Sequence, residues 1–470
     1  MLMETILIKT LQLILSLTIL VVIHELGHFA FSRLFKVRVE KFYVFFNPWF
    51  SLFKFKPKSS DEKSKSGFCK DDSLYVAQGK HRDTEWGLGW LPLGGYCKIA
   101  GMIDESMDVE QMKQPEQRWE FRTKPAWQRL LIMVGGVLFN FLLALFIYAM
   151  VLFTWGESYL LPQDFKQGMR YGSVAHEIGF QDGDVLLTAD GEALARWPKT
   201  VRQLADAREI TVLRGGKEEI VYMTDDLLPK MMAANEAFAT PIFPYVIDSL
   251  LPQSALASAG LQRGDCIVSL NGQEFSSFAE YSERIARLQE EKAPRTVQLA
   301  YVRGTQRDTA AVTLDAEYKG GAYPYGLTHY YPPRTQEYGF FASIPAGIQL
   351  GISTMTGYVN DLKYVFTKEG ASSLGGFGTI GSIFPSSWDW YSFWTMTAFL
   401  SIILAVMNIL PIPALDGGHV LFLFYEIIFR RKPGEKFMER TQMVGMFLLF
   451  GLMIWANFND VLRMIFGIKL

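Results

Sequence analysis

Residues 11–31 read LQLILSLTILVVIHELGHFAF, an apolar run that ends in two histidines, His24 and His28, with Glu25 beside the first. No residue before His24 in this run is charged, and about 20 apolar residues cross a hydrocarbon core of about 30 Å. Ionisable side chains are costly inside a bilayer and usually mark function there. The stretch therefore predicts a membrane-spanning helix with a functional site near one end.

The polar residues of this run fit the pattern HExxH. On a helix, residues i and i+4 share one face, so His24 and His28 can reach the same metal ion while Glu25 lies beside the water that the ion binds. The chain has six histidines, and a chance match is expected about 0.004 times in such a composition. The alternative is a helix end at the membrane interface, where polar side chains face water freely.

Three further apolar blocks complete the predicted membrane domain. The apolar run at residues 11–31 continues into polar residues and lacks a small-x-small cleavage site. We therefore interpret it as a retained span rather than a signal peptide. Four crossings are expected, at about residues 6–34, 126–155, 392–412 and 441–458.

Basic residues predict the orientation of these spans. The loop after the first span is rich in Lys and Arg from Arg33 to Lys65, and the loop before the fourth span carries five basic residues between Arg430 and Arg440. Short basic loops remain on the cytoplasmic side. Both termini and the segment between the second and third spans are therefore expected outside, with the HExxH site near the cytoplasmic side.

Composition excludes several classes of protein. Of the 470 residues, 49% are hydrophobic. The formal net charge of -2 creates no overall positive electrostatic potential that would attract nucleic acid. The three cysteines, Cys69, Cys97 and Cys266, form no CxxC pair. A disulfide scaffold and a cysteine-based zinc cluster are therefore excluded.

The long segment between the second and third spans contains a repeat. Residues 173–192 align without a gap with residues 254–273, an offset of 81 residues. Each copy has a Gly-Asp turn, an alternating strand and a hairpin turn, and ends a later strand in Arg-Gly. The copies resemble PDZ domains of bacterial membrane proteases, at about residues 158–237 and 238–330, which bind extended peptides by adding them to a sheet edge. For the Gly-Asp turns taken alone, a purely structural role is a stronger interpretation than a role in peptide binding.

A candidate third metal ligand follows the third span. The chain reads Asn408-Ile-Leu-Pro-Ile-Pro-Ala-Leu-Asp416-Gly-Gly-His419, and its two prolines prevent a regular helix. Irregular backbone at membrane depth is tolerated where it lines protein or a wet cavity. Asp416 offers an oxygen ligand, with His419 as the alternative, while Asp416 as a simple helix cap is the structural explanation. Asn408 supplies an amide that can bond a substrate backbone or a developing oxyanion.

These motifs together resemble the site-2 protease family of intramembrane zinc metalloproteases, in its bacterial regulator-of-sigma-E protease branch. The resemblance covers nearly the whole chain. It implies that His24, His28 and Asp416 hold one Zn²⁺, that Glu25 is the general base, and that the protein is in the bacterial cytoplasmic (inner) membrane. It also implies substrates that are single-span membrane proteins trimmed by an earlier cut, such as anti-sigma factors, or remnant signal peptides.

Two further elements match the family more loosely. Residues 87–96, including Gly87 and Gly89, look like the membrane-associated β-hairpin (about 84–100) that holds substrate in extended form. Gly136 and Asn140 look like the family's GxxxN element and suggest a substrate contact at Asn140, although helix packing is the stronger explanation for this pair. A hydrophilic insertion at about 54–82 departs from the family pattern.

The expected fold is a multi-pass α-helical membrane protein with about four transmembrane helices, a membrane-associated β-hairpin and two tandem PDZ-like α+β domains. Its membrane domain comprises residues 1–157 and 331–470, and residues 338–364 form either an interfacial amphipathic helix or support for that domain. Residues 373–381 form a glycine-rich stretch that either borders substrate entry or is a plain loop. The expected partners are membrane-protein substrates, peptides at the PDZ-like domains and the lipid bilayer, without nucleic acid.

Two other functions compete with proteolysis. One is a non-catalytic PDZ scaffold that holds peptide tails, and the other is a metal transporter with an intramembrane site. A scaffold has no reason to keep an intact metal-binding triad, and a transporter explains neither the external peptide-binding modules nor a glutamate beside the two histidines.

Overall fold

The computed structural model separates the chain into two compact units. Unit 1 comprises Met1–Gly156 and Glu337–Leu470, and unit 2 comprises Glu157–Gln336. The structure describes residues 2–57, 84–92, 94–102, 115–197, 199–224, 230, 237–251, 254–362 and 375–466. The predicted insertion at 54–82 lies largely outside these residues.

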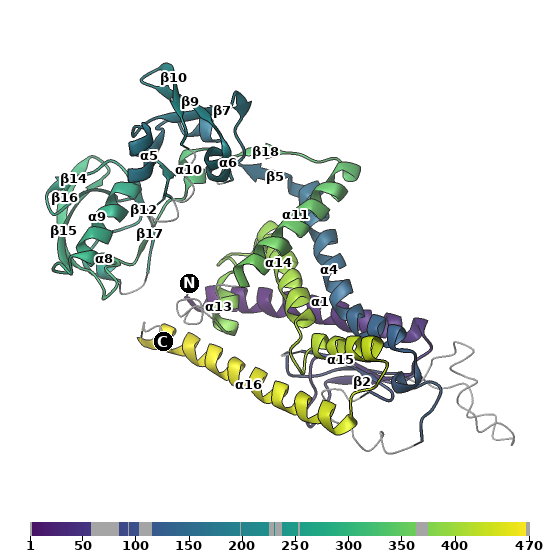
Figure 1. The fold of residues 1–470 in the computed structure, drawn as a ribbon. Helices are drawn as coiled ribbons and strands as arrows, with labels where there is room; N and C mark the ends of the chain where they lie inside the picture. Colours follow the sequence, from purple (N-terminus) through teal and green to yellow (C-terminus); the bar gives the residue numbers. More distant parts are fainter. Residues whose placement is uncertain are drawn as a thin grey trace. The chain divides into compact units, whose positions relative to one another are not determined.

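Unit 1 is built on long apolar helices (Figure 1). Four helices of the described chain are long and apolar enough to cross a membrane, at the four places where the sequence predicts spans. They are α1 (Leu2–Leu34), α4 (Ala126–Trp155), α14 (Trp390–Ile409) and α16 (Glu435–Phe466). Helix α14 ends at Ile409, before the predicted end at 412, because Pro411 and Pro413 follow.

Helix α4 is central to unit 1 and packs against α1, α14, α11 (Phe340–Asp361) and α15 (Asp416–Phe429). Helix α11 falls in the predicted segment 338–364 and packs on α4 so closely that a Cβ at Gly347 would lie 2.4 Å from the backbone nitrogen of Ala149. The same helix also exposes apolar side chains, including Phe341 and Ile348. Helix α13 (Phe377–Ser382) contacts both α1 and α16.

A four-stranded sheet follows α1 in unit 1. Its strands are β1 (Val39–Val44), β2 (Phe53–Phe55), β3 (Glu85–Leu88) and β4 (Tyr96–Ile99), in the order β2-β3-β1-β4. The prediction of a β-hairpin at 84–100 is wrong in its pairing, because β3 and β4 both pair with β1 rather than with each other. No local pattern predicts the parallel β1–β3 pair, because its strands lie about 40 residues apart and are joined by no local turn.

Unit 2 contains two repeats with the same order of elements. The first repeat is β6 (Met169–Tyr171), α5 (Ser173–Ile178), β7 (Val185–Ala189), β8 (Glu192–Ala193), α6 (Thr200–Asp206), β9 (Glu209–Arg214), β10 (Lys217–Tyr222) and β11 (Ala239–Pro241). The second is β12 (Tyr245–Leu250), α8 (Ala255–Ser258), β13 (Cys266–Leu270), β14 (Gln273–Glu274), α9 (Phe278–Glu290), β15 (Thr296–Arg303), β16 (Gln306–Thr313) and β17 (Ala322–Pro324). Because β11 pairs with β6, the first repeat reaches Pro241, past the boundary expected at 237.

The predicted hairpin turns are confirmed in both repeats. Strands β7 and β8 pair across Asp190-Gly191, and β13 and β14 pair across Asn271-Gly272. All four turn residues have positive φ, between 50° and 80°, as the tight turn of a two-residue β-hairpin requires.

The Gly-Asp turns have a structural explanation in both repeats. Asp184 and Asp265 are each 1% exposed. The guanidinium of Arg214 donates to Asp184 from Nε at 2.8 Å and Nη2 at 2.6 Å. Arg303 donates to Asp265 in the same way, at 2.7 Å from each nitrogen. The Asp of each turn is thus held by the Arg of the later Arg-Gly pair, which supports the structural interpretation of both motifs.

Two short strands join the ends of unit 2. Strand β5 (Glu157–Tyr159) pairs antiparallel with β18 (Arg334–Gln336). Arg334 also forms an ion pair with Asp164 in the 3-10 helix Pro162–Asp164. The segments that enter and leave unit 2 therefore run side by side. The last helix of the unit is α10 (Leu327–Tyr330).

Candidate metal centre

The HExxH motif lies on α1, where that helix packs against α4. His24, Glu25 and His28 are each 9% exposed or less. A Cβ at Gly27 would lie 2.2 Å from the carbonyl oxygen of Gly135 on α4, so only glycine permits this approach of the two helices. The glycine inside the motif therefore brings α4 close to both histidines.

Asp416 approaches the histidines from an irregular turn. Helix α14 ends at Ile409, the chain doubles back over residues 410–415 with Ala414 at a φ of 74°, and α15 begins at Asp416. A Cβ at Gly417 would lie 1.9 Å from the carbonyl oxygen of Leu410, which makes glycine necessary at this position. The two prolines and this glycine thus place the Asp416 side chain opposite α1.

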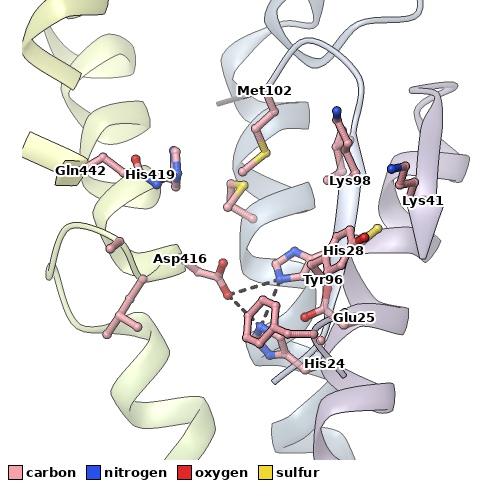
Figure 2. A pocket seen from close by; sticks show the side chains of 17 residues that line it. His24, Glu25, His28, Lys41, Tyr96, Lys98, Met102, Asp416, His419 and Gln442 are labelled. Carbon is pink, nitrogen blue, oxygen red and sulfur yellow. Dashed lines mark hydrogen bonds and ion pairs between the residues drawn. The ribbon is translucent and has the colours of Figure 1, made fainter. Parts of the chain in front are cut away.

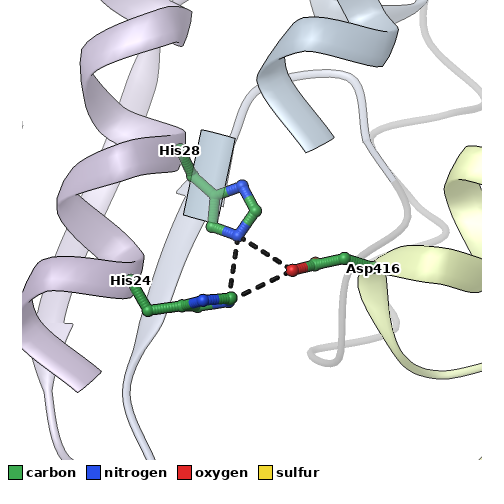
Figure 3. A group of neighbouring side chains, drawn as sticks. All are labelled: His24, His28 and Asp416. Atoms are coloured by element: carbon green, nitrogen blue, oxygen red, sulfur yellow. Dashed lines mark hydrogen bonds and ion pairs between the residues drawn. The ribbon is translucent and has the colours of Figure 1, made fainter. Parts of the chain in front are cut away.

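The three side chains point toward one another (Figures 2 and 3). Oδ2 of Asp416 lies 3.1 Å from Nε2 of His24 and 3.3 Å from Nε2 of His28, and the two Nε2 atoms are 3.2 Å apart. Tetrahedral zinc bonds of about 2.0–2.1 Å to nitrogen or oxygen put neighbouring ligand atoms about 3.3 Å apart. The triangle formed by these atoms therefore matches one face of a zinc coordination tetrahedron.

The chemistry of the three atoms also fits a metal ion. Oδ2 of Asp416 is buried and receives no hydrogen bond in the part of the chain that the structure describes. Nδ1 of His28 lies 2.9 Å from the carbonyl oxygen of Ile132. A carbonyl can only accept, so Nδ1 carries the proton and the lone pair of Nε2 is directed at the group. His24, His28 and Asp416 are the candidate metal-ligand group found among the described residues.

His419, the alternative ligand, is outside this group. Its Nε2 lies 3.1 Å from the side-chain amide of Gln442 on α16, although His419 lines the same cavity as the triad. Asn408, at the end of α14, has its amide nitrogen 3.5 Å from Nε2 of His24. The structure thus brings Asn408 to the triad and leaves His419 at the cavity wall.

Glu25 lies at the boundary between the triad and the sheet. It forms a hydrogen bond with the backbone of Cys97 on β4, which as a bond to a carboxylate is donated by the backbone N–H. A cavity of about 280 Å³ adjoins Glu25 and the triad, with Tyr96, Lys98 and Lys41 on the side of the strands (Figure 2). The general-base candidate is therefore fixed at the edge of β4.

The predicted residues of the loosely matched elements occupy different places. Gly87 lies in β3, where a Cβ would lie 2.1 Å from the ring of Tyr43, and Gly89 packs on the backbone of Phe46. Strand β3 is paired on both sides, by β2 and β1, so it has no free edge to which an extended substrate could add. The outer strand on the side of the metal centre is β4.

Gly136 and Asn140 lie on the face of α4 that meets the histidines. A Cβ at Gly136 would lie 2.5 Å from Nε2 of His28 and 2.6 Å from Cε1 of His24, so the two rings occupy the space that a side chain would need. The side-chain amide of Asn140 lies 3.3 Å from Nδ1 of His24. Both residues are therefore neighbours of the candidate metal ligands.

Several functional contacts had no signal in the sequence. The partner of His28 is the backbone carbonyl of Ile132, which no side chain marks in the sequence. The partner of His419 is Gln442, a single polar residue near the start of a long apolar helix. Small residues such as Gly27 and Gly135 permit close packing of apolar helices, but the sequence does not show that these two glycines meet.

Comparison with known proteins gives one consistent result. The model of peptidase family M50 matches residues 12–62 and 73–452. A Vibrio cholerae protein named "Putative zinc metalloprotease" is 28% identical over 98% of this chain and 100% of its own length. The "Regulator of sigma E protease" of Haemophilus influenzae is 26% identical over 96% of this chain and 98% of its own length. A Campylobacter jejuni protein, "Putative zinc metalloprotease Cj1068", is 26% identical over 97% of this chain and 94% of its own.

Proposed function

The chain belongs to peptidase family M50, the site-2 protease family of zinc metalloproteases, and we propose that it hydrolyses peptide bonds within the transmembrane segments of membrane proteins. The observation that carries this proposal is the triangle of His24, His28 and Asp416. Two of its three ligand residues belong to a helix long and apolar enough to cross a membrane. A hydrolytic centre on such a helix is suited to substrates that lie in the bilayer.

The residues around the triad suit peptide hydrolysis. When bound, zinc supplies Lewis-acid chemistry, because it polarises a carbonyl group and acidifies water. The Glu25 carboxylate, held by the backbone of Cys97, would accept the proton from the attacking water and return it to the leaving amine. The amide of Asn408, within 3.5 Å of His24, is placed to donate a hydrogen bond to the substrate carbonyl as negative charge develops on its oxygen.

Strand β4 is the best candidate for holding the substrate backbone. A peptide bond in a helix is shielded by the hydrogen bonds of that helix, so the segment must unwind and bond to another partner. Among the described strands, β4 pairs with β1 alone, and its residues line the cavity at Glu25. An extended substrate strand added to β4 would pass directly in front of the catalytic glutamate.

The orientation in the membrane is part of the proposal. The basic loops after α1 and before α16 favour a cytoplasmic location for those loops. The metal centre then lies near the cytoplasmic side of the bacterial inner membrane, and both termini and unit 2 lie outside the cytoplasm. We expect Cys97, on the cytoplasmic side, to remain reduced.

A non-catalytic scaffold is the second candidate function, and the observation that favours it is the pair of β-rich repeats in unit 2. The test is a comparison of wild-type protein with Glu25→Gln in lipid vesicles that contain a single-span peptide substrate. The variant keeps shape and polarity but cannot accept a proton, so we expect a loss of cleavage of about 10²- to 10⁴-fold with zinc content unchanged. Equal cleavage by the two proteins would reject Glu25 as the base, and no cleavage by either would favour the scaffold.

Unit 2 is proposed to select substrates that an earlier cut has shortened, such as anti-sigma factors or remnant signal peptides. Deleting residues 168–317 removes most of both repeats and leaves every triad residue in place. We expect the deleted protein to bind zinc and to cut substrates with bulky external domains, which the full chain rejects. If the deleted protein still cuts only shortened substrates, the repeats are not a size filter, and peptide binding becomes their proposed role.

A further inference from the structure

Asn140 is completely buried between the helices of unit 1. Its exposed fraction is 0%, and it lies one helical turn after Gly136, which packs against both imidazole rings. The hydroxyl of Ser401 on α14 donates to the backbone carbonyl of Asn140 at 2.7 Å. This bond ties the backbone of α4 at Asn140 to α14, and complete burial leaves the side chain no surface for a substrate.

The neighbour of the Asn140 amide is the ring nitrogen of His24 that faces away from the triad. Nδ1 of His24 lies 3.3 Å from the amide, while Nε2 of the same ring faces Asp416 and His28. A neutral imidazole carries one proton, so a ring that offers the lone pair of Nε2 to a metal must carry that proton on Nδ1. Nδ1 then needs a hydrogen-bond acceptor.

The amide of Asn140 has that acceptor. Its oxygen, Oδ1, is buried and has no hydrogen-bond partner among the described residues. Rotation of the amide by 180° exchanges its oxygen and nitrogen, two atoms of similar size. This rotation brings Oδ1 to the position beside Nδ1, where it can accept the Nδ1 proton, and moves the amide nitrogen to the place of Oδ1.

We propose that Asn140 is a positioning residue for His24, whose side-chain oxygen accepts the Nδ1 proton and so keeps Nε2 available for the metal. His28 already has the equivalent arrangement, because its Nδ1 donates to the carbonyl of Ile132 at 2.9 Å. Helix α4 thus holds both histidines, one through its backbone and one through a side chain. The inference rests on the proposed zinc site, and it gives Asn140 a role other than substrate binding or packing.

Three variants of the full chain separate these roles. Asn140→Asp keeps an acceptor and removes the donor, Asn140→Leu removes both at similar volume, and Thr397→Val is the control. Thr397 is also 0% exposed and hydrogen-bonded within the helices, to Ser16 and the carbonyl of Phe393. The readout is the zinc dissociation constant of purified protein, measured by competition with a chromogenic chelator.

We expect Asn140→Leu to weaken zinc binding about 10- to 100-fold, as the loss of a partner of a metal-binding histidine does in other proteins. Asn140→Asp and Thr397→Val should stay within about threefold of wild type. Equal weakening by Leu and Asp would mean that the amide acts as a donor, and wild-type affinity in Asn140→Leu would mean that it has no positioning role. Either result overturns the inference. Absence of zinc binding in the wild-type chain would instead reject the proposed function.

A second measurement decides the case if Asn140→Leu does not fold. With ¹⁵N-labelled histidine, nuclear magnetic resonance of the zinc-bound protein detects a proton on Nδ1 of His24, which His24→Ala identifies. We expect this proton signal to move downfield in Asn140→Asp, because a carboxylate accepts a stronger hydrogen bond than an amide. An unchanged signal would overturn the inference.

Discussion

Buried carboxylates occur in both units of the molecule, and their partners differ. In unit 2, Asp184 and Asp265 each accept two hydrogen bonds from an arginine and one from a backbone N–H. In unit 1, Oδ2 of Asp416 lies beside the Nε2 atoms of His24 and His28. Among the described residues it receives no hydrogen bond. A buried charge needs compensation. The chain itself supplies this compensation in unit 2, whereas in unit 1 the carboxylate is left to bind a cation.

The largest expected effect is at Asp416. Asp416→Ala removes one of three protein ligands, and we expect zinc content to fall from about one per chain to nearly none, with loss of cleavage. His419→Ala is the matched control, because His419 lines the same cavity without joining the triad. Zinc analysis of the two purified variants makes the comparison, and equal retention of zinc by both would reject this ligand set.

A smaller effect is expected at Asp184. Asp184→Asn keeps the size of the side chain but weakens its hydrogen bonds to Arg214, and a hydrogen bond to a charged group contributes about 1.5–3 kcal/mol. We expect the free energy of unfolding of residues 157–336 to fall by about that amount in urea denaturation. The same substitution in the full chain should leave zinc content unchanged. Zinc loss without loss of stability would contradict the division between structural and metal-binding carboxylates.

The smallest effect is a dependence on pH. Burial raises the pKa of Asp265, but hydrogen bonds from Arg303 and the backbone of Gln262 outweigh burial and hold this pKa below its usual value. The folded state thus binds the proton less tightly than the unfolded chain, whose Asp pKa is about 4. The stabilisation is complete above that pH and is lost as the pH falls through the lower pKa of the folded state.

The corresponding experiment compares unit 2 with its Asp265→Asn variant in denaturation series between about pH 6 and pH 3. We expect stability to decrease less steeply with falling pH in the variant, because its amide does not titrate. Parallel curves for the two proteins would show that Asp265 does not contribute to the acid sensitivity of this unit.

The candidate spans and the candidate metal ligands could be predicted because each rests on a local pattern. The spacing of His24 and His28 puts both on one helix face, and Pro411 and Pro413 mark an irregular turn that ends at Asp416. Both signals lie within a few residues. The chemistry of the segment makes Asp416 a candidate third ligand beside His419, and the resemblance to a family favours Asp416, since no local rule joins residues almost 400 positions apart.

The sheet of unit 1 and the neighbours of the histidines could not be predicted in this way. Strand β1 inserts between β3 and β4 through pairings that no turn sequence encodes, so Gly87 lies on an inner strand and β4 is an outer strand. The contact of Asn140 with His24 depends on the crossing of α1 and α4 at Gly27 and Gly135. Helix packing geometry of this kind arises from the whole interface rather than from one motif.

The most direct test of the metal centre is X-ray absorption at the zinc edge of the purified full chain. We expect about one zinc ion per chain, bound to nitrogen and oxygen at about 2.0–2.1 Å, with scattering from two imidazole rings and none from sulfur. In Asp416→Ala, any remaining zinc should lose one oxygen ligand and keep both imidazoles. A wild-type spectrum with sulfur ligands, or with fewer than two imidazoles, would contradict the assignment of His24, His28 and Asp416 as the zinc site.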